Sequence, residues 1–183
     1  MGYTTLAAVK AWAEFETDDH DDVLEALIES ATAIIENKTN RVFAVDAESD
    51  QAFTRISGMQ RQRFSGKTLF FYQELAEEAS AITDSPTVTY LPEDGPPYYG
   101  CYKTDGTWAY PTVTVTGYWG YSKTPPADIE QACLRLVKWL FDLKDTTSSA
   151  QAVVTPEGQV LLPQGLPNDI LILLKPYIKQ VVA

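Results

Sequence analysis

Apolar residues recur at intervals of three and four positions in three stretches of the chain. Such spacing places them on one face of a helix, so helices are expected over residues 5–15, 19–37 and 126–144. Thr4 or Thr5 can cap the first of these helices with a side-chain oxygen. The apolar face of the third helix is made of Ile129, Ala132, Cys133, Leu136, Val137, Leu140 and Leu143.

Between residues 42 and 122 the helical period gives way to short segments rich in β-branched and aromatic residues. The segments expected to form strands are residues 51–57, 63–72, 87–91 and 112–119. The predicted fold class is therefore α+β, mainly α. It is a small helical bundle with a β-rich insertion between the second and third long helices.

Two segments of this insertion are expected to have other structures. Residues 91–100 hold Pro92, Pro96 and Pro97, which lack a backbone donor and fix φ, so a loop is expected there. Residues 74–81 (ELAEEASA) look locally helical.

The C-terminal part has a pattern of its own. Residues 151–163 predict a hairpin, because the proline and glycine of TPEG suit the second and fourth positions of a type I turn. A last helix is expected to start near Pro167 and to kink or end near Pro176. Its apolar face is made of Ile170, Leu173, Leu174 and Tyr177. These features divide the chain into a main domain over residues 1–149 and a C-terminal arm over residues 150–183.

The chain is acidic, with 14 Lys and Arg against 25 Asp and Glu and a net charge of −11. Proteins that grip nucleic acid must neutralise phosphates with basic residues, so this balance does not favour a dedicated DNA binder. The surplus charge has two interpretations, a solubility charge and an acidic channel wall along which DNA slides. Basic residues cluster only in residues 55–67 and at Lys175 and Lys179.

Residues that could carry chemistry have simpler explanations. The single histidine, His20, is expected at an exposed helix start, and Cys133 belongs to the apolar face of a helix. Residues 18–22 resemble a calcium loop, but Val23 stands where such a loop needs glycine. Cys101 has no histidine nearby that would activate it. We therefore expect no catalytic residue, no metal and no cofactor.

Targeting and membrane signals are also weak. Residues 1–12 lack the basic start and continuous apolar core of a signal peptide. No apolar run approaches the length that spans a bilayer, so no membrane partner is expected.

Several short motifs follow one another in a defined order. They are Leu6…Val9-Lys10…Trp12; Asp22…Leu24…Leu27-Ile28…Ala31-Thr32…Glu36…Thr39…Arg41…Phe43; Tyr90-Leu91-Pro92-Glu93-Asp94-Gly95-Pro96-Pro97-Tyr98; Val115-Thr116-Gly117-Tyr118-Trp119-Gly120-Tyr121-Ser122; and Thr124-Pro125-Pro126-Ala127-Asp128-Ile129 before a helix ending Trp139-Leu140-Phe141…Lys144-Asp145. This order resembles the head–tail connector proteins of tailed bacteriophages, also called adaptor or head completion proteins. Asn40 stands where a glycine often precedes the arginine, and asparagine also accepts a left-handed conformation.

The resemblance implies a structural protein of the virion neck that is assembled in the host cytoplasm and is not an enzyme. Such proteins form a homo-oligomeric ring, commonly of twelve copies, docked to the portal protein. The ring extends the channel, through which duplex DNA passes without sequence-specific binding, and supports a stopper or tail-completion protein. Residues 1–149 would then be the connector domain.

Two candidate contact regions follow. The arm is expected either to dock the portal or to pack on its own domain, with candidate residues Leu161, Leu162, Leu166, Pro167, Ile170, Leu173, Leu174 and Tyr177. Candidates for contact with a neighbouring subunit or stopper are Tyr98, Tyr99, Tyr102, Trp108 and Tyr110. The alternative function is a sugar- or protein-binding module of a phage particle, with a hydrolase as a more distant alternative.

Overall fold

The computed structural model describes residues 2–54, 64–83, 86–108, 112–146, 153–154, 160–161 and 165–179. Contacts divide the chain into two compact units. The first, the helical unit, joins residues 1–41 to residues 126–183, and the second, the β unit, is residues 42–125. The expected β-rich insertion between the second and third helices is therefore confirmed.

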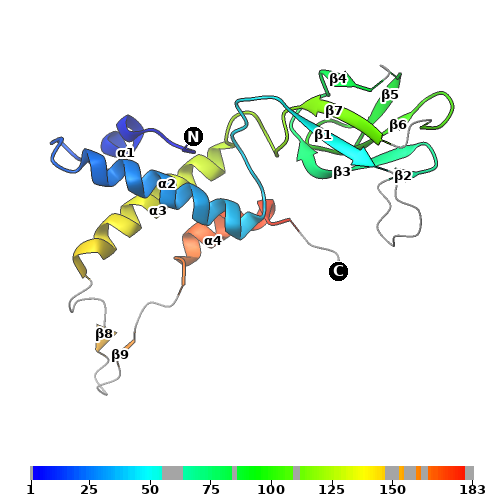
Figure 1. Cartoon of the computed structure of the whole chain (residues 1–183). Helices are drawn as coiled ribbons and strands as arrows, with labels where there is room; N and C mark the ends of the chain where they lie inside the picture. Colours follow the sequence, from blue (N-terminus) through cyan, green and yellow to red (C-terminus); the bar gives the residue numbers. More distant parts are fainter. Residues whose placement is uncertain are drawn as a thin grey trace. The chain divides into compact units, whose positions relative to one another are not determined.

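The helical unit contains α1 (Leu6–Ala13), α2 (Asp21–Thr39), α3 (Ala127–Thr146) and α4 (Asn168–Leu174), followed by the short 3₁₀ helix η1 (Lys175–Tyr177) (Figure 1). These elements confirm the helices expected from the apolar spacing, with ends that differ by a few residues.

Local sequence explains where the first two helices begin and end. The Thr5 hydroxyl caps α1 by accepting a hydrogen bond from the Ala8 amide at 3.2 Å. Glu14 closes α1 and Asn40 closes α2, both in the left-handed conformation (φ 57° and 55°). At Asn40 the amide donates to the Glu36 carbonyl, so an orphan carbonyl of the last turn is satisfied.

The core of the helical unit is mainly aliphatic. Residues that are fully or almost fully buried in it are Val9, Leu24, Ala31, Ile35, Ile129, Ala132, Cys133, Leu136, Val137, Ile170 and Leu174. They come from all four α-helices, so N-terminal and C-terminal segments build one core together.

The position of α4 differs from the expected division at residue 149. Ile170 and Leu174 retain 1% and 0% of their exposure, and α4 packs against α3 and α2. Arg135 on α3 pairs with Asp169 at 2.7 Å, and the Lys179 amide donates to the Thr39 carbonyl at 2.9 Å. The last helix therefore belongs to the helical unit, because its apolar face is buried there.

The β unit consists of two antiparallel sheets, ordered β1-β7-β4 and β2-β3-β6-β5. The strands are β1 (Ser49–Thr54), β2 (Phe64–Ser65), β3 (Thr68–Leu75), β4 (Ala81–Ile82), β5 (Val88–Leu91), β6 (Tyr98–Lys103) and β7 (Thr112–Gly117). Gly66 (φ 60°) forms the tight turn between β2 and β3. Gly120 is needed for close approach, since a Cβ there would lie 2.3 Å from Val45 Cγ2.

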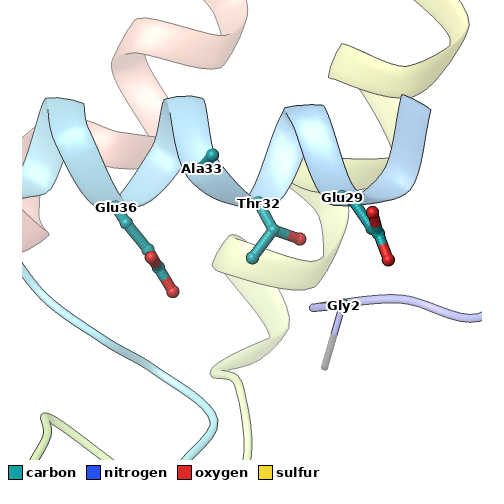
Figure 2. Close-up of a pocket in the computed structure, with 5 residues that line it drawn as sticks. All are labelled: Gly2, Glu29, Thr32, Ala33 and Glu36. Carbon is teal, nitrogen blue, oxygen red and sulfur yellow. The ribbon is translucent and has the colours of Figure 1, made fainter. Parts of the chain in front are cut away.

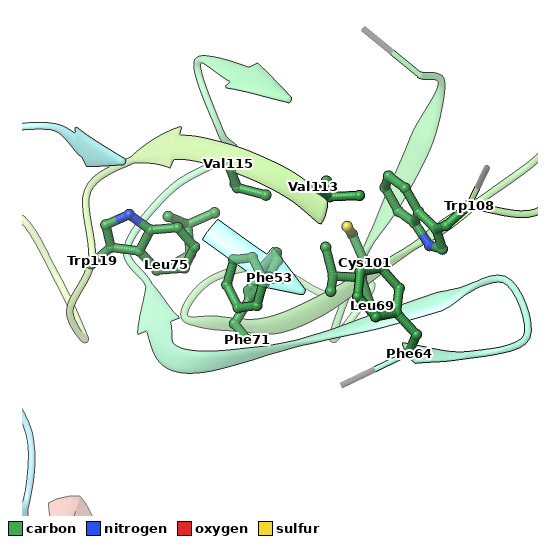
Figure 3. Close-up of a cluster of buried hydrophobic side chains, with 10 residues drawn as sticks. All are labelled: Phe53, Phe64, Leu69, Phe71, Leu75, Cys101, Trp108, Val113, Val115 and Trp119. Carbon is green, nitrogen blue, oxygen red and sulfur yellow. The ribbon is translucent and has the colours of Figure 1, made fainter. Parts of the chain in front are cut away.

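An aromatic cluster fills the core of the β unit (Figure 3). Its members are Phe53, Phe64, Leu69, Phe71, Leu75, Cys101, Trp108, Val113, Val115 and Trp119. Both indole nitrogens donate to backbone carbonyls, Trp108 to Lys67 at 2.7 Å and Trp119 to Ser49 at 2.8 Å. The polar edges of the two buried rings are thus satisfied inside the unit.

Two expectations about the insertion were wrong. The end of the expected loop belongs to β6, which places Cys101 in a buried strand between β3 and β5. The prolines interrupt strand pairing only in the turn between β5 and β6, where the Leu91–Pro92 and Pro96–Pro97 peptide bonds are cis. The segment expected to be helical instead finishes β3 and continues without helix to β4, because Leu75 is buried in the sheet core.

The expected C-terminal hairpin is confirmed where the structure describes it. Strand β8 (Val153–Val154) pairs antiparallel with β9 (Val160–Leu161), whereas the expected turn lies outside the described residues. None of the helices in the described ranges is long and apolar enough to cross a membrane.

Candidate interaction surfaces

Both cysteines are buried, Cys133 on the apolar face of α3 as expected and Cys101 in β6, where no strand was expected. Burial raises the pKa of the Cys101 thiol to about 12 and that of Cys133 to about 11, so both stay protonated at neutral pH. His20 is exposed, and its ring packs edge-on against Phe141 with centroids 5.2 Å apart. Within the described ranges no three acidic, histidine or cysteine side chains are grouped to hold a metal ion.

The acidic segment before α2 forms ion pairs with α1. Lys10 on α1 pairs with Asp18 and, at 2.8 Å, with Asp21 in the first turn of α2. The bond with Lys10 lowers the pKa of the Asp18 carboxyl and raises the pKa of the Lys10 amine. The segment is therefore tied to α1, while His20 at the N-cap makes no side-chain capping bond.

The candidate portal-binding residues fall into three groups. Ile170 and Leu174 are buried inside the helical unit, whereas Leu166, Pro167, Leu173 and Tyr177 are half-buried at its surface. Leu161 is in β9, and Leu162 lies outside the described residues. The structure thus separates residues that hold α4 in place from residues that remain accessible to a partner.

The candidate contact residues of the β unit also differ in how far they are exposed. Trp108 is a core residue with 3% exposure, and Tyr110 lies outside the described residues. Tyr98 and Tyr102 are half-buried, and the Tyr102 hydroxyl donates to Glu93 at 3.1 Å. Tyr99 is the accessible member, with half of its surface exposed.

Two aromatic residues of β3 that were not among the expected contact residues, Phe70 and Tyr72, keep 36% and 51% of their surface exposed. They alternate with the buried Leu69 and Phe71, so period-two alternation within the segment could have identified them. Phe70 lies directly opposite Gly100 of β6, which has no side chain to pack on its ring. Tyr72 stacks on Phe53 at 5.0 Å.

A pocket of about 270 Å³ lies between the N-terminal segment and α2. Figure 2 shows its lining by Gly2, Glu29, Thr32, Ala33 and Glu36. Glu36 accepts a hydrogen bond from the Tyr3 hydroxyl at 2.7 Å. The pocket thus includes a contact that fastens the N-terminal segment to α2.

The chain has an α+β architecture. A helical unit that includes the C-terminal helix α4 is interrupted by a β-rich insertion of two sheets. That is the architecture implied by the resemblance to phage head–tail connectors. A family model described as "Head completion protein" matches residues 3–179, which include both units and α4. The chain belongs to this family, and its predicted structural role in head–tail connection is confirmed.

Solved structures share the fold at low sequence identity. A chain in a structure of the neck of an empty GTA particle, computed with C6 symmetry, is 13% identical and aligns with a TM-score of 0.64 over 99% of this chain and 92% of that one. A chain of the native particle's neck, computed with C12 symmetry, is 14% identical with a TM-score of 0.59, covering 100% and 96%. A third, from the virion of the native gene transfer agent, is 15% identical with a TM-score of 0.53, covering 99% and 92%. No curated protein matches the chain.

Proposed function

We propose that this chain forms a homo-oligomeric ring in the neck of a tailed-phage or phage-like particle. The match to the head completion family over residues 3–179 is the observation that carries this proposal. The fold shared with chains of particle necks computed with C6 and C12 symmetry supports a ring whose copy number is a multiple of six. Head-to-tail contacts between identical subunits close such a ring when the rotation between them closes.

The ring acts through its geometry and not through catalysis. Duplex DNA passes through its lumen, and the acidic surface limits adhesion because like charges repel the phosphates. The two buried thiols and the single exposed histidine support a role without bond-making chemistry.

The portal protein is the proposed partner of the β8–β9 hairpin and the accessible residues near α4. An isolated two-stranded hairpin is marginally stable in water, so β8 and β9 are stabilised when they pack against a partner. Leu166, Pro167, Leu173 and Tyr177 extend the contact, while Ile170 and Leu174 hold α4 on its own unit.

The stopper or tail-completion protein is the proposed partner of the exposed aromatic residues of the β unit. Phe70, Tyr72 and Tyr99 offer large apolar surfaces at little cost in conformational entropy.

The neck role is tested by imaging particles made with and without this protein. We expect heads that lack it to carry a portal but no further ring and to join no tails, and purified protein to restore both. Particles with unchanged necks and attached tails in its absence would overturn the proposal.

The two partner contacts are tested with a matched pair of variants. Replacing residues 151–163 with a Gly-Ser linker should abolish binding to portal-bearing heads while the thermal unfolding midpoint stays unchanged. Tyr99→Ala should keep portal binding and weaken stopper recruitment, because that side chain lies in the other unit. Undiminished portal binding by the linker variant would remove the hairpin from the portal contact.

A further inference from the structure

Opposite charges collect at the two ends of α2. Near its N-terminal end Glu14, Glu16, Asp19 and Asp22 are exposed, and the structure gives none of these four an ion pair with another described residue. Near its C-terminal end the basic residues are Lys38, Arg41, Lys175 and Lys179, of which the three lysines have no ion pair among the described ranges. Two acidic residues also lie there: Glu36 near the end of α2, and Asp128, which accepts a hydrogen bond from the Tyr177 hydroxyl at 3.4 Å. The helical unit therefore has an acidic end and a basic end.

Contacts within the unit place these two ends far apart. The Lys10–Asp21 ion pair keeps the end of α1 and the following loop at the start of α2. The Lys179–Thr39 backbone bond keeps the tail after η1 at the end of α2. With a rise of about 1.5 Å per residue, the two ends of α2 are on the order of 25 Å apart.

Each end also exposes apolar side chains. At the acidic end Trp12 keeps 43% and Val23 keeps 38% of its surface exposed. At the basic end Ile172 and Ile178 keep 62% and 40%. Both ends thus combine charge with apolar surface, the composition that a specific protein contact requires.

The dipole of α2 does not explain the whole distribution. Acidic residues at a helix start and lysines at its end are stabilising, which accounts for Asp22 and Lys38. Lys175 caps the C-terminal end of α4, where a cation is also favoured, but Glu14 and Glu16 precede α2 and Lys179 follows η1, so helix dipoles give no reason for the signs of these three.

We propose that the acidic end of one copy packs against the basic end of the next copy, forming the subunit contact of the ring. Identical ends would bring like charges together, whereas unlike ends attract, so the contact is head-to-tail. Such a contact repeats around a ring, which is the closed assembly expected here. This inference rests on the proposed neck function and assigns the surfaces that build the ring.

Charge reversal at each end provides the test. The variants are E16K/D19K at the acidic end and K175E/K179E at the basic end. Glu16 and Asp19 lie outside α2, so their reversal leaves the first turn of that helix intact. The control is D94K/D105K, which changes the net charge by as much as E16K/D19K, and by the same amount but with opposite sign to K175E/K179E, on exposed residues of the β unit. Thermal unfolding confirms that each variant is folded, and K175E alone replaces the basic-end variant if the double change unfolds it.

The readout is the fraction of portal-bearing heads that carry a ring. Each reversed variant alone should lower that fraction about tenfold, because every contact then joins like charges. A mixture of the two variants should restore rings, since alternating copies again bring unlike ends together and an even copy number allows alternation. The control should assemble like wild type.

Two results would overturn the inference. In the first, the reversed variants assemble as well as wild type. In the second, they fail alone and also fail as a mixture. If wild-type protein itself never joins the neck, the proposed function fails, which is distinct from either result.

Discussion

The helical unit and the β unit build their hydrophobic cores in different ways. The helical unit joins two segments of chain separated by the whole insertion, and its core is mainly aliphatic. The β unit is one continuous segment with a core rich in aromatic rings. The first unit joins segments on either side of the insertion. The second combines two local hairpins, β2–β3 and β5–β6, with longer pairings of β3 with β6, β4 with β7 and β1 with β7.

This difference bears on where partners bind. The indoles of Trp108 and Trp119 use their donors inside the β unit, so its largest rings are committed to its own core. The helical unit leaves charged and apolar side chains uncovered at both ends of α2. We therefore expect the helical unit to make the contacts between copies and the β unit to present Phe70, Tyr72 and Tyr99 outward.

Phe53→Ala should have the largest effect and should be confined to the β unit. Phe53 is fully buried and contacts Phe71 and Trp119, with ring centroids 5.7 and 5.9 Å away. Removing a buried ring costs about 3–5 kcal/mol of unfolding free energy. Hydrogen exchange should accelerate over residues 42–125, with the helical unit unchanged. Phe70→Ala, at an exposed position, is the control, and equal acceleration in both units would show that they unfold together.

Leu174→Ala tests how firmly α4 belongs to the helical unit. Leu174 is completely buried, so its truncation should cost about 2–5 kcal/mol. Ile172→Ala removes a neighbouring side chain that is 62% exposed and should cost less than about 0.5 kcal/mol. Urea denaturation of both variants measures the difference, and similar costs would mean that α4 does not depend on this anchor.

Gly120→Ala tests the close approach at the end of the β unit. The added Cβ would meet Val45 Cγ2 at 2.3 Å and the Val42 carbonyl oxygen at 2.9 Å. Overpacking of this kind costs about 1–3 kcal/mol, measured by thermal unfolding. Adding Val45→Ala should recover part of the loss, because the closest clashing atom is then gone. A single variant as stable as wild type would contradict the crowding.

Acidification should weaken the attachment of α4 slightly. Arg135 holds the pKa of Asp169 below its usual 3.8, so the folded state favours the ionised carboxyl. The stabilisation is complete well above pH 3.8 and is lost as the pH falls through the lower, folded-state pKa. Both side chains are about half exposed, so the effect is the smallest of the four. Asp169→Asn should remove this part of the pH dependence of the unfolding free energy between pH 6 and pH 3. An unchanged pH profile would show that the Arg135–Asp169 pair does not contribute to it.

Sequence periodicity predicted the helices well because each has an apolar face that repeats every three or four residues. It failed at residues 74–81, where ELAEEASA has strong helical propensity but Leu75 is held in a sheet core. It also missed β6, because prolines beside Tyr98 indicated a loop and strand pairing with β3 and β5 was not visible locally. Tertiary contacts also decided that, of two candidate contact residues, Trp108 is buried and Tyr99 is exposed.

By itself the sequence determined the family, the α+β class and the order of helices around a β-rich insertion. These depend on local periodicity, on capping and turn residues, and on a motif order that survives in the linear chain. Only the tertiary structure decided that α4 completes the helical unit and that residues of opposite charge lie at the two ends of α2. Both depend on contacts between residues far apart in sequence, such as Arg135 with Asp169 and Thr39 with Lys179, whose pairing no local pattern encodes.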